Sequence, residues 1–441
     1  MLPLLLLQTI FVVDDTPGPG VNFPDIPPAI AAAADGDILV VQPGVYTHFA
    51  LSGKGLRIAG SGSGTTIVSG LAPTGFTSAI TNVPSGSLAY VDGMRFTSTL
   101  GGFLTLGPRV TISGASTRAE LADVAIDGSS CVSPYGPTLN AGLYVLDATV
   151  HVTRSQITGG PGCHGFAGVP NPAGFGLVVD GGGRAHVSSS VLLGGAGACC
   201  AFAPGGDGAP AVAALAGSEV SLGDCQVTGG GGGTSISSSA GVPSPAISVD
   251  AAFVRISGGP TSLVMGGAFP GATFCVPPSP LLPPAVVTSS GGTASVHSVP
   301  LFHGSGNSCP PIPQTSGAGI TFGAPALPVL EASGSLTRSG SATFDVTNGP
   351  AGAAFLLVIA VSPAYGPLGS GALGELLVDP FLFAPIASGN LSATGAFSLT
   401  LPLGGFSPGI AYLPVVLQAA AFDPAASAWL LSNATTVAVR P

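Results

Sequence analysis

The chain has 441 residues, of which 69 are glycine, 42 are proline and only 7% are charged. Its net charge of -10 leaves no basic patch to neutralise phosphates, which argues against nucleic-acid binding and against electrostatic attraction to anionic membranes. Hydrophobic residues reach 46% and the mean hydropathy is +0.60, so the Gly and Pro content indicates an ordered chain with many corners rather than a disordered one.

The first residues, 1–9, are an apolar run that is too short to span a bilayer and that lacks the basic residues of a complete signal peptide. We expect a truncated or atypical export signal there, and the alternative is an ordinary first strand. Pro27–Ala34 predicts a short helix with prolines in its first turn, where a missing amide costs least. An N-terminal cap and a first coil are therefore expected over 10–52.

A repeat occupies the middle of the chain. Gly-Gly pairs begin at positions 159, 194, 229 and 266, which gives steps of 35, 35 and 37 residues. Each unit contains an apolar strand, a corner of small residues, a second strand and then Gly-Gly, and none has helical spacing. A fixed period of this length indicates stacked units that cover one another's apolar faces. We predict a parallel β-helix over 53–312.

The N-terminal pattern resembles a known family. The helix, Gly36-Asp-Ile-Leu-Val-Val41, Pro43-Gly-Val-Tyr46 and Gly55-Leu-Arg-Ile-Ala-Gly60 are similar to the cap and first coil of pectin-lyase-like, right-handed, single-stranded parallel β-helix proteins of bacterial extracellular type. The resemblance covers roughly 10–310 and implies an all-β fold whose helix covers the open end of the stack. Because this superfamily contains lyases, hydrolases, epimerases, adhesins and proteins without a known reaction, it implies little about activity.

The repeat pattern ends at a Pro-rich passage, and strand-like segments of a different kind follow it. We expect a linker over 313–328 and, over 329–441, a small β-sandwich of short strands separated by Pro, Gly and Asn turns. The segment from Leu417 to Asn433 is similar to the ending of sandwich modules at the C-termini of bacterial secreted proteins. Trp429, the one tryptophan, is expected in the core of this sandwich, and the alternative is a sugar-stacking platform.

Seven cysteines fall in or after successive coils: Cys131, Cys163, Cys199, Cys200, Cys225, Cys275 and Cys309. Equivalent loops of neighbouring coils lie about 5 Å apart, within reach of a disulfide. We predict the pairs Cys131–Cys163, Cys275–Cys309, and Cys225 with Cys199 or Cys200, which requires an oxidising compartment and agrees with export. The alternative is buried free thiols; no Cys-x-x-Cys spacing supports zinc.

Two sets of aligned residues are candidates for chemistry. Asp147, Asp180 and Asp250 each end the first strand of a coil and could stack as a Ca²⁺ site, unless each only caps its own turn. His151 and His186 occupy a second column, with Glu219 at the same place in the third repeat and His297 as a less secure member. A His beside a carboxylate and an Arg such as Arg154 or Arg184 could abstract a proton. We expect instead that these residues are surface positions on a strand.

The best enzyme candidate combines Asp92 and Arg95 with Asp123 and Asp127. In an unbent strand the last two would lie about 13 Å apart, too far for a carboxylate pair acting on one bond. We therefore expect a secreted or cell-surface protein without a clear catalytic constellation, without a required cofactor and without a transmembrane anchor, whose partner is a polysaccharide or cell-surface glycan or whose role is adhesive. A polysaccharide lyase or glycoside hydrolase acting in a groove is the alternative. Exposed aromatic residues would favour binding, and three tyrosines are candidates: Tyr90, Tyr135 and Tyr144.

Overall fold

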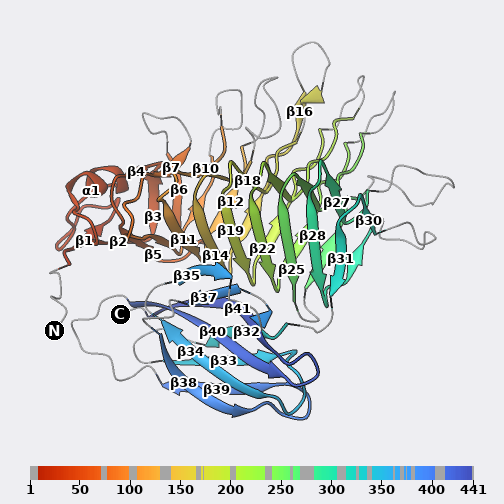
Figure 1. The fold of residues 1–441 in the computed structure, drawn as a ribbon. Helices are drawn as coiled ribbons and strands as arrows, with labels where there is room; N and C mark the ends of the chain where they lie inside the picture. Colours follow the sequence, from red (N-terminus) through yellow and green to blue (C-terminus); the bar gives the residue numbers. More distant parts are fainter. Residues whose placement is uncertain are drawn as a thin grey trace.

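The structure, a computed structural model, describes residues 8–70, 77–98, 107–129, 141–164, 170–171, 173–198, 205–233, 241–258, 262–268, 283–304, 314–323, 327–334, 340–360, 363–367, 372–373, 375–378, 383–402 and 413–439. A long solenoid of stacked coils carries a second, smaller unit against one of its sides (Figure 1). The chain is all-β apart from one short helix, as the sequence predicted.

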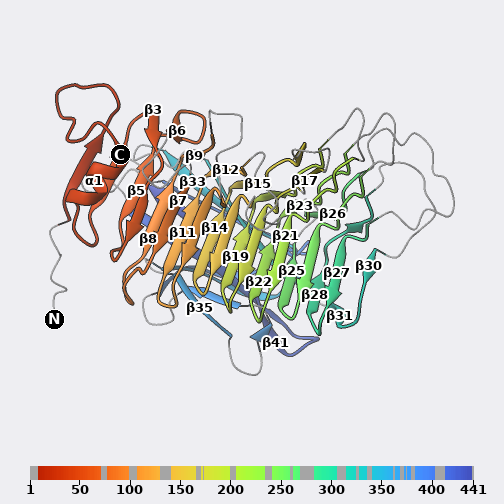
Figure 2. The same cartoon turned by 90° about the horizontal axis from the view of Figure 1, so that it is seen from above.

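Three parallel sheets form the walls of the solenoid. Sheet A contains, in order, β1 (Ile10–Val13), β2 (Ile38–Val41), β5 (Arg57–Gly60), β8 (Ala89–Asp92), β11 (Arg118–Ala122), β14 (Thr149–Thr153), β19 (Arg184–Ser188), β22 (Glu219–Gly223), β25 (Phe253–Ser257), β28 (Thr293–His297) and β31 (Ile320–Gly323). Sheet C contains β4 (Ala50–Ser52), β7 (Ser78–Thr81), β10 (Val110–Ser113), β13 (Leu143–Leu146), β18 (Leu177–Asp180), β21 (Val212–Leu215), β24 (Ile247–Asp250), β27 (Val286–Ser289) and β30 (Thr315–Ser316). Sheet B contains β3 (Gly44–Thr47), β6 (Thr66–Gly70), β9 (Arg95–Phe96), β12 (Ala125–Asp127), β15 (Gln156–Thr158), β20 (Val191–Leu193), β23 (Gln226–Thr228), β26 (Leu263–Met265) and β29 (Leu301–Phe302). Each full coil runs from sheet C to sheet A to sheet B, and Figure 2 shows the strands stacked side by side along the axis. A short antiparallel pair, β16 (Cys163–His164) and β17 (Pro170–Asn171), lies in one connection from sheet B to sheet C.

Alternation along each strand decides what fills the solenoid. In β14, Val150 and Val152 are fully buried members of the central core, whereas His151 and Thr153 point to the opposite face of the sheet. The same alternation recurs in the other sheet A strands from β8 to β28, because in-register parallel pairing aligns equivalent residues. Along the five-residue strands, three columns of residues therefore lie on the outer face of sheet A.

The helical cap is confirmed. The helix α1 (Ile26–Ala32) begins after Asp25, whose carboxylate accepts a hydrogen bond from the amide of Ile26, and has prolines in its first turn. Ile26 and Ile30 are buried in the solenoid core. At the other end, the Lys54 ammonium donates to the carbonyls of Ile30 and Ala33 at 2.6 Å, satisfying groups that the end of the helix leaves unpaired.

The corners between sheets A and B place non-glycine residues in the left-handed region. Asp123, Arg154, Ser189 and Asp224 have φ between 46° and 51°. A side chain in this conformation costs roughly 1–2 kcal/mol, so these corners are retained by contacts made around them.

The C-terminal unit consists of antiparallel sheets that share a core. One sheet contains β32 (Val329–Gly334), β33 (Ser341–Thr347) and β39 (Phe397–Pro402); the other contains β34 (Ala354–Ala360), β38 (Phe383–Asn390), β40 (Leu413–Asp423), β41 (Ala428–Val439) and β36 (Ala372–Leu373), the last of which pairs in parallel. A two-stranded sheet, β35 (Pro363–Pro367) with β37 (Glu375–Val378), completes it. Leu330 and Phe344 from the first sheet pack with Leu357 and Leu417 from the second. We call this unit the sandwich.

The linker prediction is partly wrong. Within 313–328, β30 pairs with β27 and β31 pairs with β28, so the solenoid continues beyond 312. The proline-rich stretch interrupts the sequence pattern, but Ile320 and Phe322 still align with the inward-facing Ala294 and Val296. The sandwich strands begin at Val329.

Candidate functional site

A column of polar side chains crosses the outer face of sheet A. Strand pairing places its members in consecutive coils, in the order Arg57, Tyr90, Glu120, His151, His186, Ser221 and Arg255. The alignment of His151 with His186 is confirmed. Glu219 and His297 do not belong to this column: Glu219 pairs with Arg184 two residues earlier, and His297 lies two residues later, level with Ser257.

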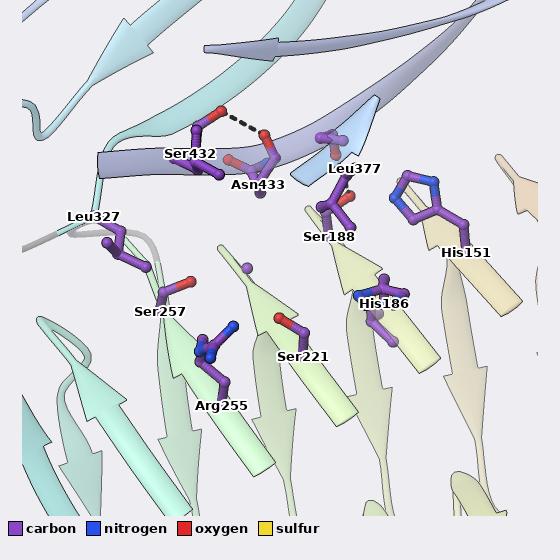
Figure 3. Close-up of a pocket in the computed structure, with 14 residues that line it drawn as sticks. His151, His186, Ser188, Ser221, Arg255, Ser257, Leu327, Leu377, Ser432 and Asn433 are labelled. Atoms are coloured by element: carbon purple, nitrogen blue, oxygen red, sulfur yellow. Dashed lines mark hydrogen bonds between the residues drawn. The ribbon is translucent and has the colours of Figure 1, made fainter. Parts of the chain in front are cut away.

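The sandwich covers this polar column. Strand β41 lies across the column, with the Ser188 hydroxyl donating to the Ala434 carbonyl at 2.8 Å and the Arg154 guanidinium donating to the Thr435 hydroxyl at 3.4 Å. Further along, the Asn348 side chain donates to the Gly258 carbonyl at 3.3 Å. Figure 3 shows His151, His186 and Arg255 on the solenoid strands facing Asn433 and Ser432 across the interface. The prediction that these histidines are surface positions is therefore wrong: His151 is 0% and His186 is 5% exposed.

Burial controls the electrostatics of the interface. Burial, followed by the charges of His186 and Arg154, lowers the pKa of His151 to about 3. The Glu120 carboxylate lies 3.8 Å from the Nδ1 of His151, with both side chains 1% exposed. A carboxylate favours the protonated imidazole, but burial is the larger effect, so His151 is neutral at pH 7.

The space left at the interface is small. The cavity lined by His151, His186, Arg255 and Asn433 holds about 20 Å³, which is room for roughly one water molecule. Sugar rings do not fit there while the sandwich is docked. The middle of the polar column, from Tyr90 to His186, is thus buried beneath the sandwich and is not an open groove.

The four enzyme candidates do not form one constellation. Asp123 is the corner residue between β11 and β12, so the chain bends between Asp123 and Asp127. Asp123 accepts from Arg154 at 2.7 and 3.1 Å, whereas Asp127 forms an ion pair with Arg95 at 2.7 Å. Asp92 is fully buried beneath the sandwich side of sheet A. Its charge and that of Asp123 both act on Arg154: burial lowers the pKa of Arg154, but the hydrogen bonds and charge of Asp123, with Tyr90 and Asp92, raise it more.

The expected aspartate ladder is wrong by one residue. Leu146, not Asp147, pairs with Asp180, and Leu215 stands between Asp180 and Asp250 in the same column. Asp180 and Asp250 therefore lie two coils, or about 10 Å, apart. Among the described residues no group of three or more acidic, His or Cys side chains is close enough to hold a metal ion. The Asp180 carboxylate accepts from the Gly181 amide at 2.7 Å, which is the turn-capping alternative.

The outer face of sheet C carries a different surface. Tyr144 is half-buried, and its hydroxyl donates to the Asp180 carboxylate at 3.2 Å. Leu146 is 38% exposed beside it, and Leu215 and Asp250 continue the column along the axis. Beneath them Ala141, Val178 and Ala213 form a small apolar cluster outside the solenoid core. We call Tyr144, Leu146, Asp180, Leu215 and Asp250 the sheet C strip.

The aromatic candidates separate clearly. Tyr90 is fully buried under the sandwich, and burial with the charges of Asp92 and Glu120 raises its pKa well above the ordinary value. Tyr135 lies outside the described residues. Tyr144 is half-buried on the outer face of sheet C, so it is the described candidate that keeps some exposed surface. Trp429 is 41% exposed and stacks edge-to-face on Phe422 at 5.5 Å, so its predicted place in the core is wrong.

Cys225 also differs from its prediction. Its thiol is free, buried in the solenoid core and directed at the carbonyls of Val187 and Gly223, both at 3.4 Å. Its expected disulfide with Cys199 or Cys200 is therefore not formed. The other two expected pairs each include a cysteine outside the described residues and stay predictions.

Comparisons with known proteins give distant likenesses to solved structures. No protein-family model matches the sequence, and no curated protein matches it. Among solved structures, the pectate lyase Pel9A matches with a TM-score of 0.35 and 12% identity over 72% of this chain and 79% of its own. The pectin methylesterase PemA from Erwinia chrysanthemi matches with a TM-score of 0.26 and 14% identity over 66% and 80% of the two chains. The catalytic domain of an α-1,3-glucanase in complex with tetrasaccharides gives 0.25 and 10% over 65% and 63%. At this level the similarity concerns the fold alone.

The strand topology defines the class of the protein. The chain is a parallel β-helix with small antiparallel sheets at its C-terminus. No helix within the described ranges is long and apolar enough to span a membrane.

Proposed function

We propose that the protein is a secreted or cell-surface glycan-binding protein, and that the sheet C strip is its binding face. The observation that carries this proposal is the pairing of the half-buried Tyr144 ring with the Asp180 carboxylate on the outer face of sheet C. Aromatic rings offer an apolar face with a polar tip, and carboxylates accept hydrogen bonds from hydroxyl groups. These two groups complement a sugar ring, which has apolar C–H faces and hydroxyl groups at its edges.

The burial of the outer face of sheet A also favours the sheet C strip as the binding face. The outer face of sheet A is covered by β41, and its remaining cavity holds about 20 Å³. On the outer face of sheet C, Leu146 is 38% exposed beside Tyr144, whereas Val178 and Ala213 on the same face are buried.

The test is retention of the full chain on immobilised glycans, comparing wild type with Tyr144→Ala. Loss of the ring contact is expected to weaken binding at least about tenfold, equivalent to about 1.4 kcal/mol. Trp429→Ala is the matched control, because Trp429 is also exposed but lies on β41 of the sandwich. Retention that depends on Trp429 and not on Tyr144 would place binding on the sandwich and overturn this assignment.

The enzyme alternative has its own readout. A polysaccharide lyase or glycoside hydrolase would release unsaturated products or reducing ends from a polysaccharide panel, with or without Ca²⁺. Four of the charged residues that are candidates for catalysis are paired with one another, Arg95 with Asp127 and Arg154 with Asp123. Product release would direct mutagenesis to Asp92, Asp123 and Asp127, and would replace the binding proposal.

A further inference from the structure

The charge around sheet C is one-sided. The sheet C strands contain two carboxylates, Asp180 and Asp250, and no Lys or Arg. In the sequence of the segments that connect each sheet B strand to the next sheet C strand, the only Lys, Arg, Asp or Glu residues are Arg109 and Asp207. Arg109 is 1% exposed, and its guanidinium donates to the Asp127 carbonyl at 2.9 Å. The rim of this sheet therefore offers no exposed cation from these segments.

Most other described cations are engaged elsewhere on the solenoid. Their partners are backbone carbonyls, carboxylates or an aromatic ring: Lys54 with Ile30 and Ala33, Arg95 with Asp127, Arg154 with Asp123, Arg184 with Glu219, and Arg255 over Phe253 at 5.5 Å. Recognition of carboxylate or sulfate groups on a ligand relies on Arg or Lys donors. Sheet C does not supply them, and the net charge of -10 repels polyanions at longer range.

The two carboxylates have a regular spacing along the axis. Asp180 and Asp250 stand in one column with Leu215 between them, so apolar and acidic positions alternate from Leu146 onward. Their separation of about 10 Å, twice the spacing of neighbouring strands, is comparable to the length of an extended disaccharide. Hydrogen bonds from the Ser290 and Ser289 side chains lower the pKa of Asp250, so this carboxylate stays charged in mild acid.

We infer that the sheet C strip takes an extended glycan that carries hydroxyl or amino groups and no acidic groups, lying along the solenoid axis with Asp180 and Asp250 accepting from groups two sugars apart. This inference rests on the proposed glycan-binding function and specifies its ligand class. The apolar positions Leu146 and Leu215 would lie under the sugars between the acceptors.

The experiment compares binding of the full chain to polyglucosamine, to a neutral glucose polymer and to polygalacturonate at fixed ionic strength. Polyglucosamine or the neutral polymer is expected to bind and polygalacturonate is not. The double variant Asp180→Asn with Asp250→Asn is expected to weaken binding at least about tenfold. Asp147→Asn is the matched control, since it removes the same charge from the neighbouring corner outside the column, and it is expected to stay within about twofold of wild type.

The outcomes separate the two proposals. Binding of polygalacturonate that is lost in Tyr144→Ala would keep the proposed function and overturn the ligand class. Binding to the non-acidic polymers that is equal in the double variant and in Asp147→Asn would also overturn the inference. Absence of any Tyr144-dependent retention would overturn the proposed function itself.

Discussion

Gly223 of β22 and Asn433 of β41 meet so closely that a side chain at position 223 has no room. A Cβ atom on Gly223 would lie 2.7 Å from the Cβ of Asn433, and neither atom can rotate away. The other residues in this outward column of sheet A, such as Ser188 and Ser257, do carry side chains. The absence of a side chain at 223 is therefore what allows the sandwich to reach the solenoid.

Gly223→Ala is expected to wedge the sandwich away from sheet A. Overpacking of this kind costs roughly 1–3 kcal/mol, so the thermal midpoint should fall, and small-angle scattering should report a larger radius of gyration. Gly64→Ala is the control, because a Cβ at Gly64 meets no atom within 4 Å. Equal midpoints and equal scattering for the two variants would mean that this contact does not hold the sandwich in place.

Acid is expected to loosen the same interface. The pKa of His151 is about 3 in the docked state against 6.5 for an exposed imidazole. When the sandwich is released, His151 on the solenoid therefore binds a proton that docking excludes. Docking is therefore fully stable above about pH 6.5 and weakens as the pH falls toward 3. The full shift corresponds to at most about 5 kcal/mol, and the Glu120 carboxylate at 3.8 Å reduces it.

Scattering between pH 7 and pH 4 measures this effect, with His151→Gln as the test variant. The variant keeps a neutral polar side chain and should stay docked to lower pH than wild type. His48→Gln is the control: burial lowers the pKa of His48 to about 4, but its ring bonds to Ser78 and Thr97 within the solenoid, so it should change overall stability and not docking. Identical opening curves for wild type and His151→Gln would remove His151 as the cause.

The sequence predicted the solenoid because its information is local and repeated. The helix is signalled by the prolines at its start, and the coils are signalled by Gly-Gly pairs that recur about every 35 residues. The structure contains both α1 and the stacked coils. Column membership was less secure because corner length varies. The corner from Leu146 to Thr149 is one residue shorter than the aligned corner from Asp180 to Arg184, so aligning both aspartates as strand ends shifted the ladder.

The interface beneath the sandwich could not be predicted in the same way. Arg154 and Thr435 are 281 positions apart, and nothing in the local pattern of β14 distinguishes an outward residue in water from one beneath a second unit. Glu120, His151 and His186 alternate with core residues as solvent-facing residues do. The prediction that Trp429 is buried was wrong because it relied on the size of the side chain. The neighbours of Trp429 in β41 take the inward positions, so Trp429 itself points outward.

Cys225 is expected to resist both oxidation and alkylation in the native protein. Burial raises the pKa of its thiol to about 12, and the reactive thiolate is therefore scarce. Peptide mapping after alkylation without reduction should show Cys225 unmodified under native conditions and modified after unfolding. Recovery of a peptide that links Cys225 to Cys199 or Cys200 would contradict the structure.

Cys225→Ser should be nearly neutral, because the equivalent positions in the two preceding coils are Ser155 and Ser190. Each of those hydroxyls donates to the carbonyl two residues before it, at 2.7 and 2.6 Å, as the thiol of Cys225 does toward Gly223. A change in unfolding free energy below about 1 kcal/mol is expected for Ser. Cys225→Leu, which is larger and has no donor, should cost roughly 1–3 kcal/mol through overpacking.

Arg154→Ala is expected to destabilise both the corner and the docking. Arg154 adopts φ 46°, a conformation costing roughly 1–2 kcal/mol, and its guanidinium bridges Asp123 on the solenoid to Thr435 on the sandwich. Alanine keeps the strained backbone and loses the ion pair with Asp123, whose carboxylate is 37% exposed, so a loss of roughly 1 kcal/mol in unfolding free energy is expected. Arg154→Gly relieves the strain while losing the same contacts, so denaturant unfolding should find it more stable than Arg154→Ala. If the glycine variant is instead the less stable of the two, the left-handed backbone conformation at position 154 is not a source of strain.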